Sequence, residues 1–175
     1  MNNLRCHCSK LSSLLFTLVM IIMLSSCHEA PRENREIVMK DGLIYKQGEL
    51  KPFTGHLKDT VEGKIIEYDV LNGMKHGEFK TYFKNGKIEM IGHIEENLNQ
   101  GEWKYFYKSG QLESEGNFSN DLPDGEWKWF YEDGNIKEQG TFVKGNREGR
   151  WVLYNSEGKK TDEKIYKQNH IVDEK

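Results

Sequence analysis

Cysteine is scarce in this chain. Three cysteines occur among 175 residues; Cys6 and Cys8 lie close to the N-terminus, so Cys27 is the only one in the remainder. Several cysteines at regular spacings would indicate a disulfide framework. Once the N-terminal segment is set aside, no internal disulfide can form.

Strong charge of one sign is also missing. The formal net charge is −3 at pH 7, and the chain has no basic stripe of the kind that nucleic-acid binding requires. We therefore expect no nucleic-acid partner. Aromatic residues make up 11% of the chain, whereas disordered chains are poor in them. The composition predicts a folded, polar domain, and the length is enough for one domain.

Only one long apolar run is present, "LLFTLVMIIML" at residues 14–24, and it follows Arg5 and Lys10. A charged start followed by a short apolar segment is typical of a secretory signal. The run is shorter than the roughly 20 residues that span a bilayer. The alternative is an uncleaved anchor.

The residues after the run are Leu24-Ser25-Ser26-Cys27, which resemble the lipobox of bacterial lipoproteins. This resemblance implies a signal peptide over residues 1–26, lipidation of Cys27 and a polar tether over residues 27–36. Acyl chains on Cys27 would hold the protein to a membrane. We expect a bacterial cell-envelope location, with the outer membrane favoured over the inner one, facing the periplasm or the exterior.

A helical period is missing after the tether, and a repeat takes its place. The segments "GEFKTYFKNGKIEMIG", "GEWKYFYKSGQLESEG" and "GEWKWFYEDGNIKEQG" start 24 residues apart, at Gly77, Gly101 and Gly125. Each has two aromatic or β-branched runs around a turn dipeptide such as Asn85-Gly86, which favours a β-hairpin. The sequence predicts an all-β fold, an elongated and twisted antiparallel meander of about five units plus caps over residues 37–166, followed by a polar tail at 167–175.

The register follows if each turn loop has an even number of residues. Trp103 then lies opposite Gly116, Tyr105 opposite Ser114 and Tyr107 opposite Leu112. We expect each large ring to cover a glycine. The rings of successive hairpins, or rungs, should lie too far apart to stack directly, with Ile88, Leu112 and Ile136 between them. We expect positive φ at the glycines after the turns, and Gly77 and its equivalents to close longer links. The predicted structural residues are Phe79, Trp103, Trp127, Trp151, Gly92, Gly116 and Gly140.

The aromatic face has two interpretations. It is either a packed core or an exposed binding strip, and a core is the commoner fate of large rings. The opposite face is charged and also carries a row of rings, which is harder to explain as core. The candidate partner-binding residues are therefore Tyr82, Phe106, Phe130, Tyr154, Lys80, Lys104 and Lys128.

Glycine, glutamate and a large ring recur at Gly77-Glu78-Phe79, Gly101-Glu102-Trp103 and Gly125-Glu126-Trp127, each followed by an aromatic pair and a turn glycine. This pattern resembles the MORN repeat variant, closest to the YwqK-like antitoxin family of bacterial MORN-type repeat proteins, over residues 41–166. The resemblance implies a platform that interacts with proteins or, in some eukaryotic members, membrane lipids. The last unit departs from it at Asn155 and Lys164, so we interpret that unit as a polar cap.

Chemistry-bearing motifs are few. No histidine has the spacing of a metal pair, and Glu113 and Glu115 alternate on a solvated strand. No Gly-rich phosphate loop precedes a helix. We expect no enzyme activity, metal, cofactor or small-molecule substrate.

The leading hypothesis is a non-catalytic, envelope-anchored lipoprotein that presents its repeats to an unknown protein partner. One alternative is a glycan- or cell-wall-binding repeat protein, since rings on β-repeats suit sugar faces. An antitoxin or immunity role is implied by the family resemblance alone.

Overall fold

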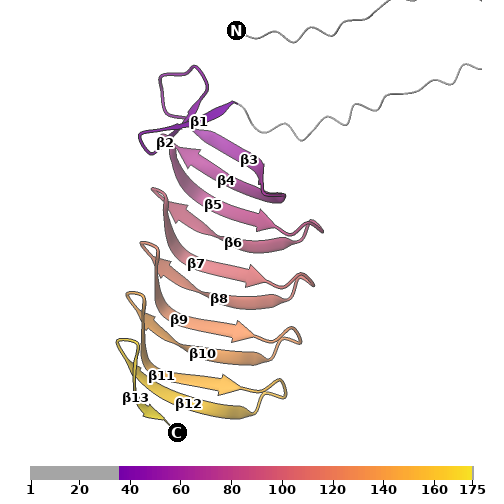
Figure 1. Cartoon of the computed structure of the whole chain (residues 1–175), viewed down its shortest axis with the longest axis vertical. Helices are drawn as coiled ribbons and strands as arrows, with labels where there is room; N and C mark the ends of the chain where they lie inside the picture. Colours follow the sequence, from indigo (N-terminus) through magenta and orange to yellow (C-terminus); the bar gives the residue numbers. More distant parts are fainter. Residues whose placement is uncertain (1–35, 175) are drawn as a thin grey trace, which may run out of the picture. The chain divides into compact units, whose positions relative to one another are not determined.

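The computed structural model describes residues 36–174, and these are all-β. The predicted signal peptide, Cys27 and nearly all of the tether lie outside the described residues. β1 and β2 form a two-stranded sheet, and eleven strands form a single antiparallel meander in chain order, from β3 at one edge to β13 at the other (Figure 1). Within the described part, no helix has the length and apolar character to cross a membrane. The strands are β1 (Ile37–Lys40), β2 (Leu43–Lys46), β3 (Gly55–Val61), β4 (Lys64–Leu71), β5 (Met74–Tyr82), β6 (Ile88–Glu95), β7 (Leu98–Phe106), β8 (Leu112–Ser119), β9 (Leu122–Phe130), β10 (Ile136–Val143), β11 (Asn146–Tyr154), β12 (Lys160–Lys167) and β13 (His170–Glu174).

Two-residue turns join successive hairpins at one end of the strands. Both central residues have positive φ, for example 49° at Glu96 and 70° at Asn97, as a type I′ turn requires. The sequence places longer links here, closed by Gly77 and Gly101, and that prediction is wrong. Strands β5 and β7 run through these glycines, which keep positive φ values of 89° and 64° inside the strands.

At the other end of the strands, the β3–β4 turn has two residues, Glu62 and Gly63, whereas the turns that follow β5, β7, β9 and β11 have three. The Phe83 N–H donates to the Lys87 carbonyl at 2.8 Å, which leaves residues 84–86 as the loop, with Gly86 at φ 82°. The even loop is therefore wrong, although the positive φ of the turn glycine is confirmed. The same loop geometry recurs at Tyr107 and Tyr131.

One extra residue restores the predicted register beyond each three-residue loop. Phe106 pairs with Leu112 but Tyr105 pairs with Ser114, so Glu113 is a β-bulge. Because the odd loop and the bulge each shift the pairing by one, Trp103 still pairs with Gly116 as predicted. Tyr107 does not pair with Leu112. Equivalent bulges lie at Glu89, Lys137 and Thr161.

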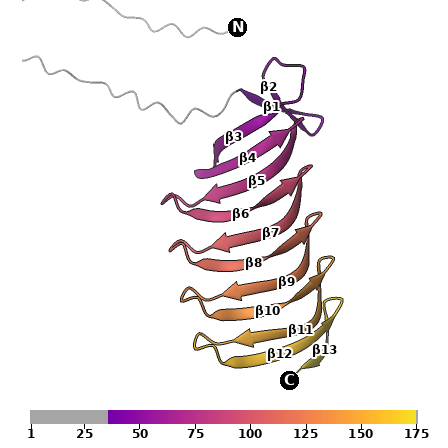
Figure 2. The same ribbon diagram turned by 180° about the vertical axis from the view of Figure 1, so that it is seen from behind.

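A second irregularity bends the strands near the two-residue turns. The register between β6 and β7 shifts between Ile91 and His93, so that three residues, 101–103, lie opposite the single residue Gly92. The strands curve at this level in both views (Figures 1 and 2). The bend folds the part of each hairpin beside the two-residue turn over one face of the sheet. Large side chains on that face are therefore buried, although the sheet is a single layer.

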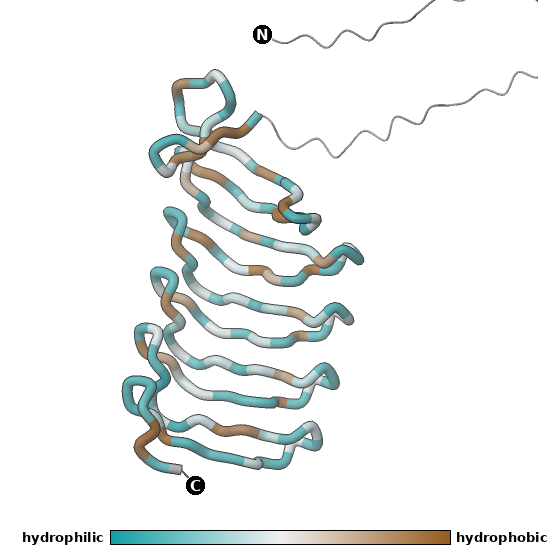
Figure 3. Tube along the Cα trace, in the orientation of Figure 1, coloured by the Kyte–Doolittle hydropathy of each residue, from teal (hydrophilic) through white to brown (hydrophobic). Residues whose placement is uncertain are grey.

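The core has two parts. Ile44 from β2 packs with Leu57 and Val70 at the N-terminal end, and a series of rings continues from there. Apolar positions recur from hairpin to hairpin along the tube of Figure 3 rather than collecting in one strand. At the far end, β13 pairs with β12, so the sheet extends past residue 166, into the predicted polar tail.

Candidate interaction surface

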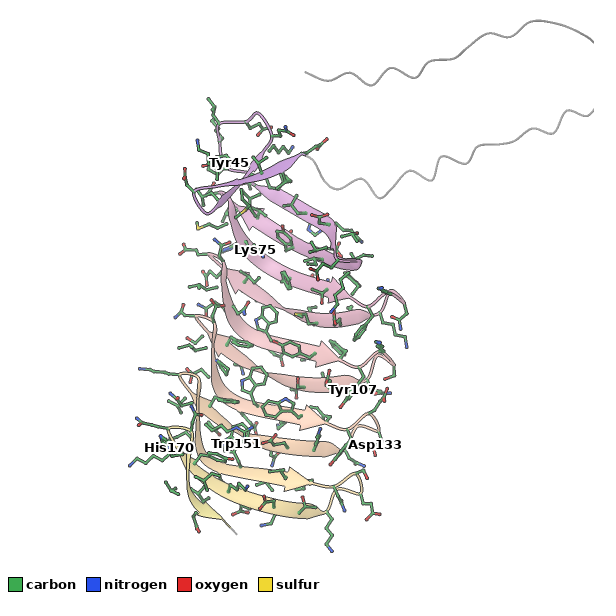
Figure 4. All side chains as sticks on the ribbon, in the orientation of Figure 1. Tyr45, Lys75, Tyr107, Asp133, Trp151 and His170 are labelled. Carbon is green, nitrogen blue, oxygen red and sulfur yellow. The ribbon has the colours of Figure 1, made fainter. Side chains whose placement is uncertain are left out.

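Three tryptophans form the centre of one face. Trp103, Trp127 and Trp151 are 3%, 6% and 0% exposed. Each indole N–H donates to a backbone carbonyl of the preceding hairpin, as from Trp103 to His93 at 3.2 Å. Figure 4 shows Trp151 in the body of the sheet, between the turn that carries Asp133 and the edge near His170. These three tryptophans therefore belong to a packed core, whereas Trp129 on the same face is half-buried.

The indoles cover glycines, but each covered glycine lies in the preceding hairpin and not, as expected, in the strand that follows. A Cβ built on Gly92 would lie 2.1 Å from the Trp103 ring, and one on Gly116 would lie 2.2 Å from the Trp127 ring. Trp103 therefore covers Gly92 in the preceding hairpin, not its register partner Gly116. The bond from the indole N–H to the preceding hairpin explains the direction.

This direction explains two departures from the repeat. Lys164 lies opposite Trp151 where a glycine is expected, yet Trp151 is fully buried because it covers Gly140. At the other end, Tyr68 occupies the glycine position beside Phe79, and the two rings stack at 6.1 Å. A phenyl ring thus replaces the indole where the preceding strand has a side chain.

The rings form a continuous ladder, contrary to the expected gaps. Centroids lie 5.8 Å apart for Phe79 and Trp103 and for Trp129 and Trp151, and 6.3 Å apart for Tyr105 and Trp127. Since the strand between two rungs presents a glycine at the level of each indole, the rings reach across it. Ile88, Leu112 and Ile136 do not fill this ladder, because they pair with the ring row of the opposite face.

The seven predicted partner-binding residues lie on the opposite face, which we call the polar face. Tyr82, Phe106, Phe130 and Tyr154, together with Lys80, Lys104 and Lys128, are all half-buried. The lysines are not free: Lys104 pairs with Glu102 at 3.2 Å and Lys128 with Glu126 at 3.1 Å, and Lys80 contacts Glu78. The basic row is therefore matched by an acidic row beside it.

The ring row is apolar in its middle and polar at its ends. Phe106 pairs with Leu112 and Phe130 with Ile136, which places an isobutyl or sec-butyl group beside each phenyl ring. The Tyr82 hydroxyl donates to Glu67 at 2.6 Å. The Tyr154 hydroxyl accepts from the Gln139 amide at 3.2 Å.

The second ring of two aromatic pairs braces the row. Tyr107 donates its hydroxyl hydrogen to the Phe130 carbonyl at 2.6 Å, and Tyr131 donates to the Tyr154 carbonyl at 2.8 Å. These bonds join the three-residue turns after β7 and β9 to the next hairpin. They hold the backbone of the ring row at a fixed spacing.

Hollows recur on the polar face above the glycines. One hollow, of about 330 Å³, is lined by Glu78, Ile91, Gly92, His93, Glu102 and Lys104. Hollows of about 160 and 180 Å³ lie over Gly116 and Gly140. Each is bordered by side chains of two successive units, so the surface repeats with the period of the sequence.

Two histidine contacts escape the sequence analysis because their members lie on different strands. His76 and His93 have their ring centroids 6.2 Å apart, and His56 contacts Asp69 and Glu67. No group of three or more metal-ligating side chains is found within residues 36–174.

The hairpin units coincide with a known repeat family. Residues 75–95, 99–120 and 123–144 match the MORN repeat variant family, and each match spans two strands joined by a three-residue turn. The match supports a MORN repeat character for these three units. The strands β11 and β12 continue the array with the same bulge. MORN repeats commonly bind proteins or membranes and are generally non-enzymatic. A search of curated proteins found no match.

Proposed function

We propose that this protein is a non-catalytic, lipid-anchored envelope protein that presents its MORN repeats to a protein partner. The partner binds the polar face along the row of Tyr82, Phe106, Phe130 and Tyr154, flanked by Lys80, Lys104 and Lys128. The lipobox-like sequence before Cys27 supports the anchor and an envelope location, with the outer membrane favoured. The MORN match supports an interaction role.

One observation carries the proposal: half-buried rings recur every 24 residues on a face that is otherwise charged. The ladder of the opposite face already supplies the core, so Phe106 and Phe130 are not needed to fill it. Apolar rings that remain partly accessible among charged groups are a common feature of protein-binding surfaces. The paired Glu and Lys rows beside the ring row would orient a partner.

The test is affinity capture from native membranes with the full-length protein. The Phe106→Ser/Phe130→Ser variant is expected to lose a specific protein that the wild type retains, with a nearly unchanged denaturation midpoint. The matched control is Leu98→Ser/Val143→Ser, which removes two apolar side chains that are 38% and 46% exposed outside the row. This control is expected to retain the protein, and direct titration of the purified partner then measures the affinity.

Three results would oppose the proposal. If both variants bind equally well, the row is not the docking surface. If Phe106→Ser/Phe130→Ser unfolds at much lower denaturant concentration, the row is core. Retention on purified peptidoglycan or polysaccharide with no protein partner would favour the glycan-binding alternative, for which Trp103, Trp127 and Trp151 offer no stacking surface because they are buried.

The anchor and the antitoxin role have separate tests. Metabolic labelling with a radioactive fatty acid is expected to mark the wild type and not Cys27→Ala, and fractionation then identifies the membrane. The antitoxin role, which rests on the resemblance to the YwqK-like family, predicts that co-expression rescues growth from a toxin encoded beside this protein.

A further inference from the structure

A cluster of ionisable groups joins the first three strands of the large sheet on the polar face. His56 Nδ1 lies 2.7 Å from Asp69 Oδ1, and His56 Nε2 lies 3.1 Å from Glu67 Oε1. The other Glu67 oxygen accepts the Tyr82 hydroxyl hydrogen at 2.6 Å. The four side chains come from β3, β4 and β5 and form one chain of contacts.

The contacts require a particular protonation state. A neutral imidazole has one N–H donor and one acceptor nitrogen, whereas the imidazolium has two donors. Both nitrogens of His56 face carboxylate oxygens, which only accept. Only protonated His56 can therefore satisfy Asp69 and Glu67 together, and deprotonation places a nitrogen lone pair against a carboxylate.

The surrounding groups keep the carboxylate of Glu67 ionised. The hydrogen bonds from Tyr82 and then from His56 lower the pKa of Glu67, and Lys58 on β3, 3.8 Å away, adds a smaller contribution. Lys80 on β5 is the backbone register neighbour of Glu67 and forms its ion pair with Glu78. The hydrogen bond to Asp69, followed by the one to Glu67, raises the pKa of His56 above its ordinary 6.5. The hydrogen bond to Glu67 raises the pKa of Tyr82 to about 12, with a smaller contribution from Glu78.

The position of the cluster gives it a consequence for the fold. β3 is an edge strand of the large sheet and pairs only with β4. Edge strands open more readily than central ones, since they have a partner on one side alone. A side-chain link between β3 and β4 adds a constraint at an edge of the sheet.

We propose that His56, Asp69 and Glu67 form a pH-dependent clasp that holds the edge strand β3 onto the repeat array. Through Tyr82, the clasp also reaches the first ring of the proposed docking row. While Asp69 and Glu67 are ionised, the clasp is complete below pH 6.5 and is lost as the pH rises through the raised pKa of His56, because a group that is protonated more strongly in the folded state stabilises that state on the acidic side.

Hydrogen exchange of the full-length protein tests the clasp and needs no partner, so its failure is separate from that of the capture experiment. Peptides covering β3 are followed by mass spectrometry at pH 6 and pH 8, with rates corrected for intrinsic exchange. The ratio of β3 protection in the wild type to that in His56→Gln is expected to fall severalfold from pH 6 to pH 8. His170→Gln, at the opposite edge strand, is the control and should follow the wild type.

A ratio that does not change with pH would overturn the clasp. If His56→Gln exposes β3 at every pH, Asp69→Asn provides the second comparison, since it keeps the shape of the side chain and removes its charge. It should leave β3 folded and reduce the pH dependence. A pH dependence in Asp69→Asn equal to that of the wild type would also refute the proposal.

Discussion

The glycines under the tryptophans provide the most direct test of the fold. Replacing Gly116 by alanine places a Cβ 2.2 Å from Trp127 Cδ2. Ordinary carbon contacts are about 3.5–4.0 Å, so the indole must move by about 1.3 Å or more. The indole is held on its other sides by Phe118 at 5.2 Å and Trp129 at 5.6 Å between ring centroids.

The expected loss is about 3 kcal/mol in the free energy of unfolding. Overpacking of a core costs about 1–3 kcal/mol, and the upper end applies because the indole lies against backbone on one side and rings on the others. The largest possible loss in the free energy of unfolding is that of removing the indole from the core, since truncation of a buried tryptophan costs about 3–5 kcal/mol.

Denaturant unfolding followed by far-ultraviolet circular dichroism and by tryptophan fluorescence measures this loss. The control is Gly101→Ala, where no atom lies within 4 Å of the added Cβ and the cost comes from the φ of 64°. A left-handed conformation costs an alanine about 1–2 kcal/mol. Gly116→Ala should therefore destabilise the protein more than Gly101→Ala, although its backbone is unstrained.

A double variant tests the cause. Gly116→Ala/Trp127→Phe imitates the natural pair of Tyr68 and Phe79, in which a side chain is opposed by a phenyl ring. Its loss should be smaller than the sum of the two single losses, because the smaller ring leaves room for the methyl group. The reasoning is refuted if Gly116→Ala costs less than Gly101→Ala, or if the two single losses add.

Two further predictions concern the ends of the strands. Asn97→Gly keeps the positive φ but removes the side-chain oxygen that accepts the Lys75 N–H at 2.8 Å, which should cost about 1 kcal/mol in denaturant unfolding; an unchanged stability would show that water replaces the oxygen without loss. Glu163 lies 2.8 Å from both Lys160 and Arg150, and hydrogen bonds to these two groups, that to Lys160 first, lower its pKa below 4.5. The stability advantage over Glu163→Gln should therefore be present above pH 4.5 and vanish as the pH falls through the lowered pKa, and an equal advantage at pH 3 and pH 7 would contradict this.

The turns show how far local patterns extend. Asn85-Gly86 marks a hairpin in the sequence, and a hairpin is present, but its loop has three residues because Gly86 takes the left-handed position of a bulged turn. The two-residue turns at residues 96–97 and 120–121 contain no glycine and are not marked as such in the sequence. Asparagine and aspartate accept the positive φ there, and their side chains bond to the preceding unit.

The candidate surface is likewise predictable from the sequence only in part. The alternation of residues along each strand assigns Phe106 and Lys104 to the face opposite Trp103, and a period of two suffices for this. The ion pairs of the lysines with Glu102 and Glu126 follow from positions i and i+2 on one strand. The clasp does not follow, since His56 and Tyr82 each reach Glu67 only through strand pairing.

From the sequence alone come the β-hairpin class, the 24-residue period and the opposition of tryptophan and glycine, since all three depend on residue type and on separations within one or two strands. Only the tertiary structure decided which of its two flanking strands each indole covers, how a single sheet buries its rings, and which ionisable groups meet at the β3 edge. These depend on the bends, the bulges and the side-chain directions, through which neighbouring strands place atoms that are distant in the chain within bonding distance.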